Sequence, residues 1–323
     1  MNEEQKNYNL QINELIQQAD EQFVKFIKEG KYKDVLMNMS NLNQYSFRNQ
    51  LLIMMQNPNA TTVNGMTAWN YFKRSIKKGE KGIKIIAPTK YYTEEEQENE
   101  NGETEVVKTE RLGYKIAYVF DVSQTDGPYE IRLFESSEEI IREEFDALKE
   151  ILEKAVKDYK FIYTLDLEKG VDGICNYKDK VIKVRDGMPT EKTLTTLVHE
   201  IAHAIAEERT QDSFKGLTKR EVKQIKEIEA ESVALVVSNR LGLRTQDFNL
   251  AYIAGWADGD IEKFRHNLDT IRGISHQLLS AIEPKIDFLR REKEKVDKVS
   301  EEEVVATKTT SVKAKKTKSE EME

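Results

Sequence analysis

The chain has 323 residues, of which 38% are hydrophobic and 33% charged, and its formal net charge is −8. This length exceeds that of a usual single domain, so two domains with solvated charged segments are expected. The net charge excludes a uniformly basic DNA-coating protein but not a local basic patch. The single cysteine, Cys175, excludes a disulfide framework and a four-cysteine zinc site.

The first twenty residues, MNEEQKNYNLQINELIQQAD, are polar and lack the apolar centre of a secretory signal. No apolar run approaches the roughly 20 residues that a transmembrane helix needs. These features predict a cytoplasmic protein without a membrane partner.

The first predicted elements are helices. Apolar residues recur at helical spacing over residues 10–27, which predicts a helix ending at Gly30. A second helix is expected over residues 46–55, and the segment MTAWNYFKRSI predicts a third that Gly79 stops.

Two runs typical of strands follow, GIKIIAP and YKIAYVFDV. The segment between them, residues 93–110, contains eight glutamates and one lysine, a composition that predicts a disordered acidic loop. The turn residues in QTDGPYE predict a domain boundary near residue 127.

The second predicted domain covers residues 128–291. A long helix over about 137–159 is expected first, and GICNYKDKVIKV predicts a strand, a turn and a second strand. Two long helices then follow, PTEKTLTTLVHEIAHAIAEE and TKREVKQIKEIEAESVALVVSNRLGL, with more helix to about residue 291. Residues 292–323 are predicted to be a disordered charged tail. The predicted fold class is α+β, a small α/β domain followed by a mainly helical domain.

The segment TLVHEIAHAIAEE contains two histidines four residues apart, His199 and His203. Positions i and i+4 share one helix face, so both rings can reach a single ion. Glu200 follows the first histidine, as in the H-E-x-x-H motif, where Zn²⁺ activates a water and the glutamate accepts its proton. The alternative is an ordinary amphipathic helix, but the chain has only four histidines and such a match by chance is rare.

A catalytic zinc site needs a third protein ligand. The next long helix offers three carboxylates, Glu227, Glu229 and Glu231. Glu227 and Glu231 share a face while Glu229 points elsewhere, so the simplest assignment makes Glu227 the ligand and Glu231 an acceptor that orients a histidine. The alternative for this helix is a solvated acidic face.

A basic segment interleaved with aromatic residues runs from residue 66 to residue 90. It has seven cations and one acid, a local charge of +6 (7 − 1). Cations that follow phosphates and aromatic rings that stack on bases are typical of single-stranded DNA binding without base preference, and the alternative is that the rings are core residues. The candidate DNA-binding residues are Arg48, Trp69, Tyr71, Phe72, Lys73, Arg74, Lys77, Lys78, Lys81 and Lys84.

Two resemblances to known families rest on these motifs. HEIAHAI followed by EIEAESVA resembles the glutamate zincins, whose second motif, E-x-x-A-[DEN], begins with the zinc ligand. VNGMTAWNYFKRSIKKGEKGIKIIAP followed by YVFDVSQTDG resembles the N-terminal single-stranded-DNA-binding domain of the ArdC antirestriction proteins. Those proteins join that domain to a zincin-like metallopeptidase domain related to the ImmA/IrrE type. The resemblance covers about residues 10–241, and the acidic insertion at 93–110 departs from it.

The resemblance implies a single-stranded-DNA-binding zinc metallopeptidase of a plasmid, phage or other mobile element. It implies an antirestriction role that protects transferred DNA, a Zn²⁺ cofactor and a protein substrate of unknown identity. One alternative is an ImmA-like regulatory protease that cleaves a repressor. The other is a DNA-protection protein whose zinc site is idle, against which the presence of Glu200 argues, because a structural site needs no base.

Overall fold

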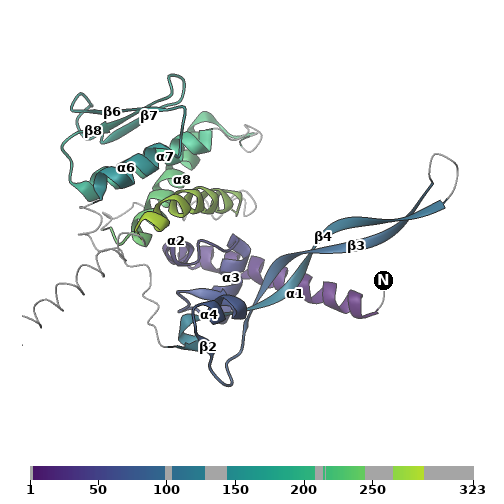
Figure 1. The fold of residues 1–323 in the computed structure, drawn as a ribbon. Coiled ribbons are helices and arrows are strands. Elements are labelled where there is room, and N and C mark those ends of the chain that lie inside the picture. Colours follow the sequence, from purple (N-terminus) through teal and green to yellow (C-terminus); the bar gives the residue numbers. More distant parts are fainter. Residues whose placement is uncertain are drawn as a thin grey trace, which may run out of the picture.

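The computed structural model describes residues 3–98, 104–127, 144–207, 214, 216–243 and 265–286. The fold class is α+β, as predicted (Figure 1). A three-stranded sheet with two long helices lies at one end of the molecule, and a small helix–strand unit lies at the other. Within the described ranges, no helix is long and apolar enough to span a membrane.

The described N-terminal half consists of four α-helices, one 3₁₀ helix and two antiparallel sheets. The first sheet has the strand order β1-β4-β3 and the second pairs β2 with β5. Ser46 caps α3, because its side chain accepts a hydrogen bond from the backbone N–H of Asn49 at 3.4 Å. The elements are α1 Glu3–Lys28, α2 Tyr32–Asn41, α3 Phe47–Gln56, β1 Val63–Gly65, α4 Met66–Tyr71, β2 Ser75–Ile76, β3 Ile83–Glu98, β4 Thr104–Asp121, the 3₁₀ helix η1 Val122–Gln124 and β5 Thr125–Asp126.

The prediction of a disordered loop over residues 93–110 is wrong for the part that the structure describes. β3 and β4 pair antiparallel as far as Glu98 and Thr104, so they form one long hairpin that projects from the body (Figure 1). The ladder satisfies the backbone groups without a core, which is why a segment with little apolar content still forms strands. Lys90 and Glu110 add a cross-strand ion pair of 2.7 Å.

The C-terminal half places a mixed three-stranded sheet against α7. β6 runs parallel to β8, and β7 pairs antiparallel with β8 at the sheet edge. A capping box of Thr218 and Glu221 starts α8. The elements are α6 Phe145–Glu153, β6 Lys160–Thr164, β7 Gly173–Asn176, β8 Val181–Arg185, α7 Thr190–Glu207, α8 Lys219–Arg240 and a helix over residues 265–286.

Most predicted elements are present, but the helix expected to reach about residue 159 ends at Glu153. The predicted helix from residue 66 to residue 76 ends at Tyr71, and β2 follows it. The sequence analysis did not identify α2 or β6 as separate elements. Several predictions fall outside the described residues: the start of the helix over 137–159, parts of the helix expected up to 291, and the tail.

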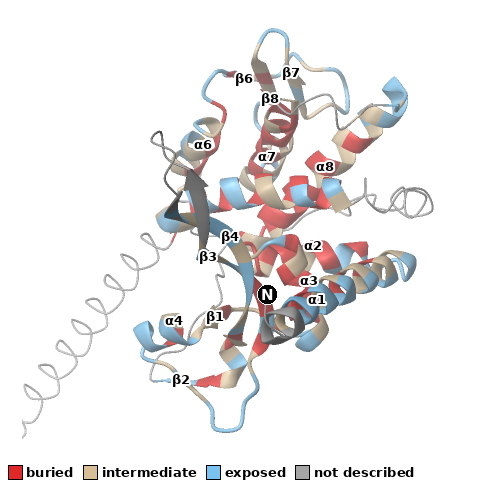
Figure 2. Cartoon of the chain, turned by 90° about the vertical axis from the view of Figure 1, so that its right-hand side faces the viewer, coloured by how far each residue is buried: buried red, intermediate tan, exposed pale blue. Residues whose placement is uncertain are grey.

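One hydrophobic core joins the two halves of the chain. It includes Val35 and Leu36 of α2, Val233 of α8 and the inner face of the helix over 265–286. Buried residues line these facing helices (Figure 2). Two hydrogen bonds cross the same boundary, from Tyr32 to Ser232 at 2.9 Å and from Asn239 to Ser40 at 3.0 Å. The helix α8 therefore packs directly against the N-terminal half.

Candidate functional site

The helix α7 places the two motif histidines on one face. Its other faces are buried in the core through Leu197, Val198 and Ile201, so the helix cannot rotate without exposing them. The His199 side chain remains 23% exposed while that of His203 is 8% exposed. The two Nε2 atoms face one another at 3.1 Å.

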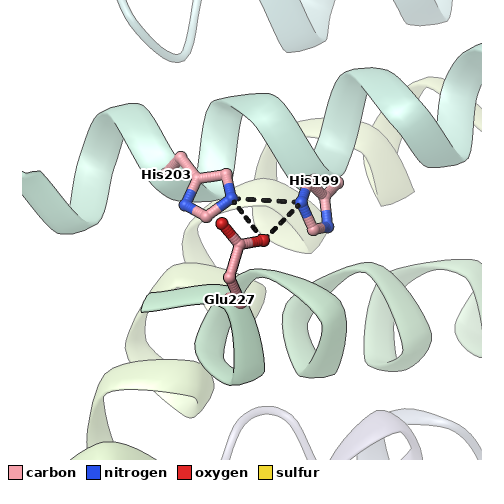
Figure 3. Close-up of side chains that lie close together, drawn as sticks. All are labelled: His199, His203 and Glu227. Atoms are coloured by element: carbon pink, nitrogen blue, oxygen red, sulfur yellow. Dashed lines mark hydrogen bonds and ion pairs between the residues drawn. The ribbon is translucent and has the colours of Figure 1, made fainter. Parts of the chain in front are cut away.

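The helix α8 brings Glu227 to the same point. Its Oε2 atom lies 3.8 Å from His199 Nε2 and 3.5 Å from His203 Nε2, so the three atoms form a triangle (Figure 3). Four ligands arranged tetrahedrally at about 2.0–2.1 Å from a Zn²⁺ ion lie about 3.3–3.4 Å from one another. The three sides of the triangle bracket this separation. The geometry therefore fits three protein ligands of one divalent ion.

The charges of the triad also suit a metal. Burial, and then the neighbouring His203, lower the pKa of His199 to about 4. The hydrogen bond to His203 lowers the pKa of Glu227 below its usual value. At neutral pH, His199 is therefore neutral and Glu227 ionised, which are the forms that bind a cation.

Glu200 occupies a different environment from Glu227. It is buried between α7 and the edge strand β7, and burial raises its pKa to about 7. The backbone N–H of Cys175 donates a hydrogen bond to its carboxylate and opposes this shift. A carboxyl group with a pKa near neutral is suited to accept and return a proton. A cation in the triad would lower this pKa again.

Gly173 is a site residue that the sequence analysis missed. A Cβ atom at this position would lie 2.6 Å from Glu200 Oε1 and 2.8 Å from Thr196 Cγ2. Only glycine therefore allows β7 to approach α7 this closely. A glycine at the start of a strand was the available signal, but the sequence did not show which helix that strand covers.

We expect Gly173→Ala to displace the Glu200 carboxylate and to lower the free energy of unfolding by about 1–3 kcal/mol through overpacking. Metal content should not change, because the atoms nearest to the new methyl group belong to Glu200 and Thr196, which are not ligands of the triad. Urea unfolding and elemental analysis measure both. Gly273→Ala is the control, since that helical position has open space. Wild-type stability for Gly173→Ala would show that β7 does not pack tightly on Glu200.

The other two candidate carboxylates are not part of the triad. Glu231 is half-buried, and burial followed by the charge of Glu227 raises its pKa. The Nδ1 atom of His203 is buried and has no hydrogen-bond partner within the described ranges. Glu231 therefore does not accept a hydrogen bond from His203 Nδ1 in this structure, and its role in orienting a histidine stays a prediction. Glu229 is buried and is not part of the triad, in agreement with the expectation that it points elsewhere.

A second missed feature fixes α8 against the end of α7. Lys226, next to Glu227 in the chain, forms an ion pair and hydrogen bond with Glu207 of α7. The ammonium group also lies over the rings of Tyr177, at 5.4 Å, and Phe214, at 5.7 Å. These contacts hold the first half of α8 in the register that directs Glu227 towards the histidines.

The structure places Trp69, one of the predicted DNA-stacking residues, in the core. Its side chain is 0% exposed, and its indole N–H donates a hydrogen bond of 2.9 Å to the carbonyl of Phe120. A ring with no exposed face cannot stack on a base, so this prediction is wrong. The large apolar area of tryptophan explains its position, because α4 has no other buried side chain to anchor it.

Two other predicted aromatics, Tyr71 and Phe72, are on the surface. Tyr71 is 84% exposed and Phe72 is 45% exposed, with their rings in edge contact at 5.6 Å. Exposed cations surround them or follow in the next loop: Lys73, Lys78, Lys81 and Lys84. These residues remain available to bind nucleic acid.

Three predicted cations make intramolecular contacts instead. Arg74 donates to Thr125 Oγ1 at 2.7 Å and to the Thr125 carbonyl at 3.0 Å. Lys77 donates to the Ser123 carbonyl at 2.8 Å, although its side chain is 41% exposed. Arg48 lies 3.7 Å from the carboxylate of Asp20. Arg74 and Arg48 therefore serve the packing of the fold.

Comparison with known proteins gives three similarities. Residues 3–120 match the family described as the N-terminal domain of anti-restriction factor ArdC. The chain is 26% identical over 301 residues to the uncharacterized protein pXO2-81 of Bacillus anthracis. That match covers 82% of this chain and 50% of the relative, so the chain spans about half the length of that protein.

The third similarity is to solved structures of the antirestriction ArdC protein from plasmid R388. The Mn(II)-bound structure is 16% identical with a TM-score of 0.46, and the match covers 82% of this chain and 97% of that protein. The metal-free structure is 17% identical with a TM-score of 0.40, and covers 72% and 84% respectively. The family match covers 118 of the 323 residues of this chain, and it is a similarity to an N-terminal domain.

Proposed function

We propose that this chain is a single-stranded-DNA-binding metallopeptidase with an antirestriction role, in which one divalent ion is held by His199, His203 and Glu227. The observation that carries the metal assignment is the triangle of two imidazole nitrogens and one carboxylate oxygen. When bound, the ion would polarise a substrate carbonyl and activate a water molecule. The antirestriction role rests on the family of residues 3–120.

The residues around the triad supply the rest of the chemistry. Glu200 is held by the Cys175 N–H and enclosed by Gly173, so its carboxylate has a defined position for accepting a proton. The edge strand β7 borders the same space and has one unpaired side within the described sheet. An extended peptide can pair with such an edge through its backbone. This arrangement supports hydrolysis of a peptide bond.

The DNA-binding part of the proposal rests on the exposed aromatics and cations. Tyr71 and Phe72 present rings beside Lys73, while Lys78 and Lys81 follow in the next loop. Stacking accepts any base, so little sequence preference is expected. Because α8 carries Glu227 and also packs on α2, the metal site is joined to the N-terminal half by one core, while the residues beneath β1 and the start of β3 form a second, smaller cluster.

We expect the purified chain to retain about one Zn²⁺ ion, and His199→Ala, His203→Ala and Glu227→Ala each to weaken retention by more than about 100-fold, beyond the usual effect of residues outside the ligand set. Elemental analysis and competition with a chelator measure this. Mn²⁺ is tested beside Zn²⁺, because the solved R388 structure carries Mn(II).

Glu231→Gln is the matched control on the same face of α8, and we expect retention within about 10-fold of wild type because Glu231 does not contact His203 Nδ1. A chain purified without chelators that takes up neither ion would contradict the metal site. Metal binding without cleavage of any peptide would favour a protection protein with an idle site. Cleavage of a co-expressed repressor would instead favour the regulatory protease.

A further inference from the structure

The body-proximal part of the β3–β4 hairpin exposes large side chains on both faces. Tyr91 and Tyr92 on β3 and Leu112 and Tyr114 on β4 are between 47% and 76% exposed. Ile86 on β3 and Ile116 on β4 pack against the core, and the hairpin projects from the body beyond its base (Figure 1). These four side chains, with the cations between them, are called here the arm surface. Its cations are Lys90, Lys108, Arg111 and Lys115.

The register of the hairpin alternates rings with charged residues. Tyr91 pairs with Arg111, Tyr92 with Glu110, and Leu112 with Lys90. No tyrosine of the arm surface is directly opposite another tyrosine in the described ladder. Aromatic pairs that stabilise a two-stranded ribbon lie directly or diagonally opposite one another. The Tyr91 ring lies over Gly113, where a Cβ atom would be 2.9 Å from its Cε1 atom. Tyr91 lies opposite the cation Arg111, whereas Tyr92 lies opposite Glu110, to which its hydroxyl donates at 3.3 Å, and Tyr114 lies opposite Pro88. A ring beside a cation, as at Tyr91, is the combination that binds single-stranded nucleic acid.

The charge of the hairpin changes sign along its length. The arm surface has four cations and one acid, Glu110, a net charge of +3 (4 − 1). Residues 94–105 contain seven glutamates and no cation. A polyanion is therefore attracted to the arm surface and repelled by the distal segment. This polarity favours a nucleic-acid strand, bound close to the body, as the occupant.

Two residues connect the arm surface with the cations of the preceding loop. Tyr118 packs on Gly82, where a Cβ atom would lie 3.0 Å from Tyr118 Cβ, and Gly82 follows Lys81. Lys84 pairs with Tyr118 across the hairpin and is exposed. A ring and a cation therefore lie between Lys81 and the arm surface, so one strand can contact both regions.

We propose that the arm surface binds single-stranded DNA by stacking of Tyr91, Tyr92 and Tyr114 on bases, while Lys115 contacts a phosphate. This inference rests on the proposed single-strand binding of the N-terminal half and extends it to the hairpin. The acidic segment beyond residue 93 limits how far along the arm the strand is bound.

The test uses the full chain and a fluorescein-labelled oligothymidine, with anisotropy measured over a range of NaCl concentrations. We expect Tyr114→Ala and Tyr92→Ala each to raise Kd about 5- to 150-fold, as for one lost base stack. Tyr114→Phe and Tyr92→Phe keep the ring and should bind like wild type. Loss of one phosphate contact in Lys115→Gln should make the negative slope of log association constant against log salt shallower by about 0.7. The control Lys169→Gln in the C-terminal half should leave the slope unchanged.

The possible outcomes distinguish a failure of the arm surface as a binding site from a failure of the proposed single-stranded-DNA binding itself. A wild-type chain that does not prefer single-stranded over duplex DNA contradicts the proposed function itself. A wild-type chain that binds, with alanine variants of equal affinity, overturns only the arm surface, as does an equal loss in the phenylalanine variants. If an alanine variant unfolds at a lower temperature than wild type, the salt dependence of Lys115→Gln is the test that decides. An unchanged salt slope in that variant overturns the inference.

Discussion

Glu200→Gln is expected to keep the bound metal ion and to lower peptide hydrolysis by about 10²–10⁴-fold, the usual contribution of a positioned base. Glutamine has the same shape and can still accept the hydrogen bond from the Cys175 N–H, so the packing beneath β7 should persist. The amide cannot accept a proton from water. A quenched-fluorescent peptide library and elemental analysis measure the two properties in parallel.

Glu231→Gln provides the matched control for this change, because it also neutralises one half-buried carboxylate near Glu227. We expect its hydrolysis rate to stay within about 10-fold of wild type, since no histidine nitrogen depends on it in the described part of the chain. If Glu200→Gln cleaves at the wild-type rate, the proton acceptor is another group. If it loses its metal, Glu200 acts in ion binding, and the assignment of three ligands needs revision.

The motif histidines were predictable because their relation is local. An i,i+4 pair shares a face on any α-helix, so the 3.1 Å approach of His199 and His203 follows from spacing alone. The choice of Glu227 over Glu229 followed from the same helical periodicity. The segment MTAWNYF has no such local relation that shows which of its aromatic rings is buried. The enclosure of Glu200 by Gly173 depends on how a distant strand packs against α7, which no local pattern specifies.

The acidic segment over residues 93–110 shows a second limit of predicting structure from amino-acid composition. Eight glutamates predict that residues 93–110 bury no core, and the exposure of Glu110 and Lys108 agrees with that. A segment that buries no core can still form strands, because the ladder of a hairpin consists of backbone hydrogen bonds. The paired strands continue a ladder that the apolar segments 83–87 and 115–119 have already aligned.

Trp69→Ala is expected to lower the free energy of unfolding by about 3–5 kcal/mol, the usual cost of truncating a buried aromatic side chain. The tryptophan is fully buried, and its removal also deprives the Phe120 carbonyl of its indole donor. Because α4 is only six residues long, it has little stability apart from this contact. Urea unfolding of the full chain, followed by circular dichroism, measures the loss.

Tyr71→Ala separates the two roles that the sequence suggested for this segment. Tyr71 lies two residues further along the same helix and is 84% exposed, so its loss should change the free energy of unfolding by less than about 0.5 kcal/mol. If a base stacks on this ring, the same variant should weaken single-strand binding by about 1–3 kcal/mol. The opposite pattern would restore the tryptophan as the stacking residue. In that pattern Trp69→Ala keeps wild-type stability but binds DNA poorly, while Tyr71→Ala binds DNA like wild type. The comparison of the buried Trp69 with the exposed Tyr71 therefore tests which ring of α4 contacts single-stranded DNA.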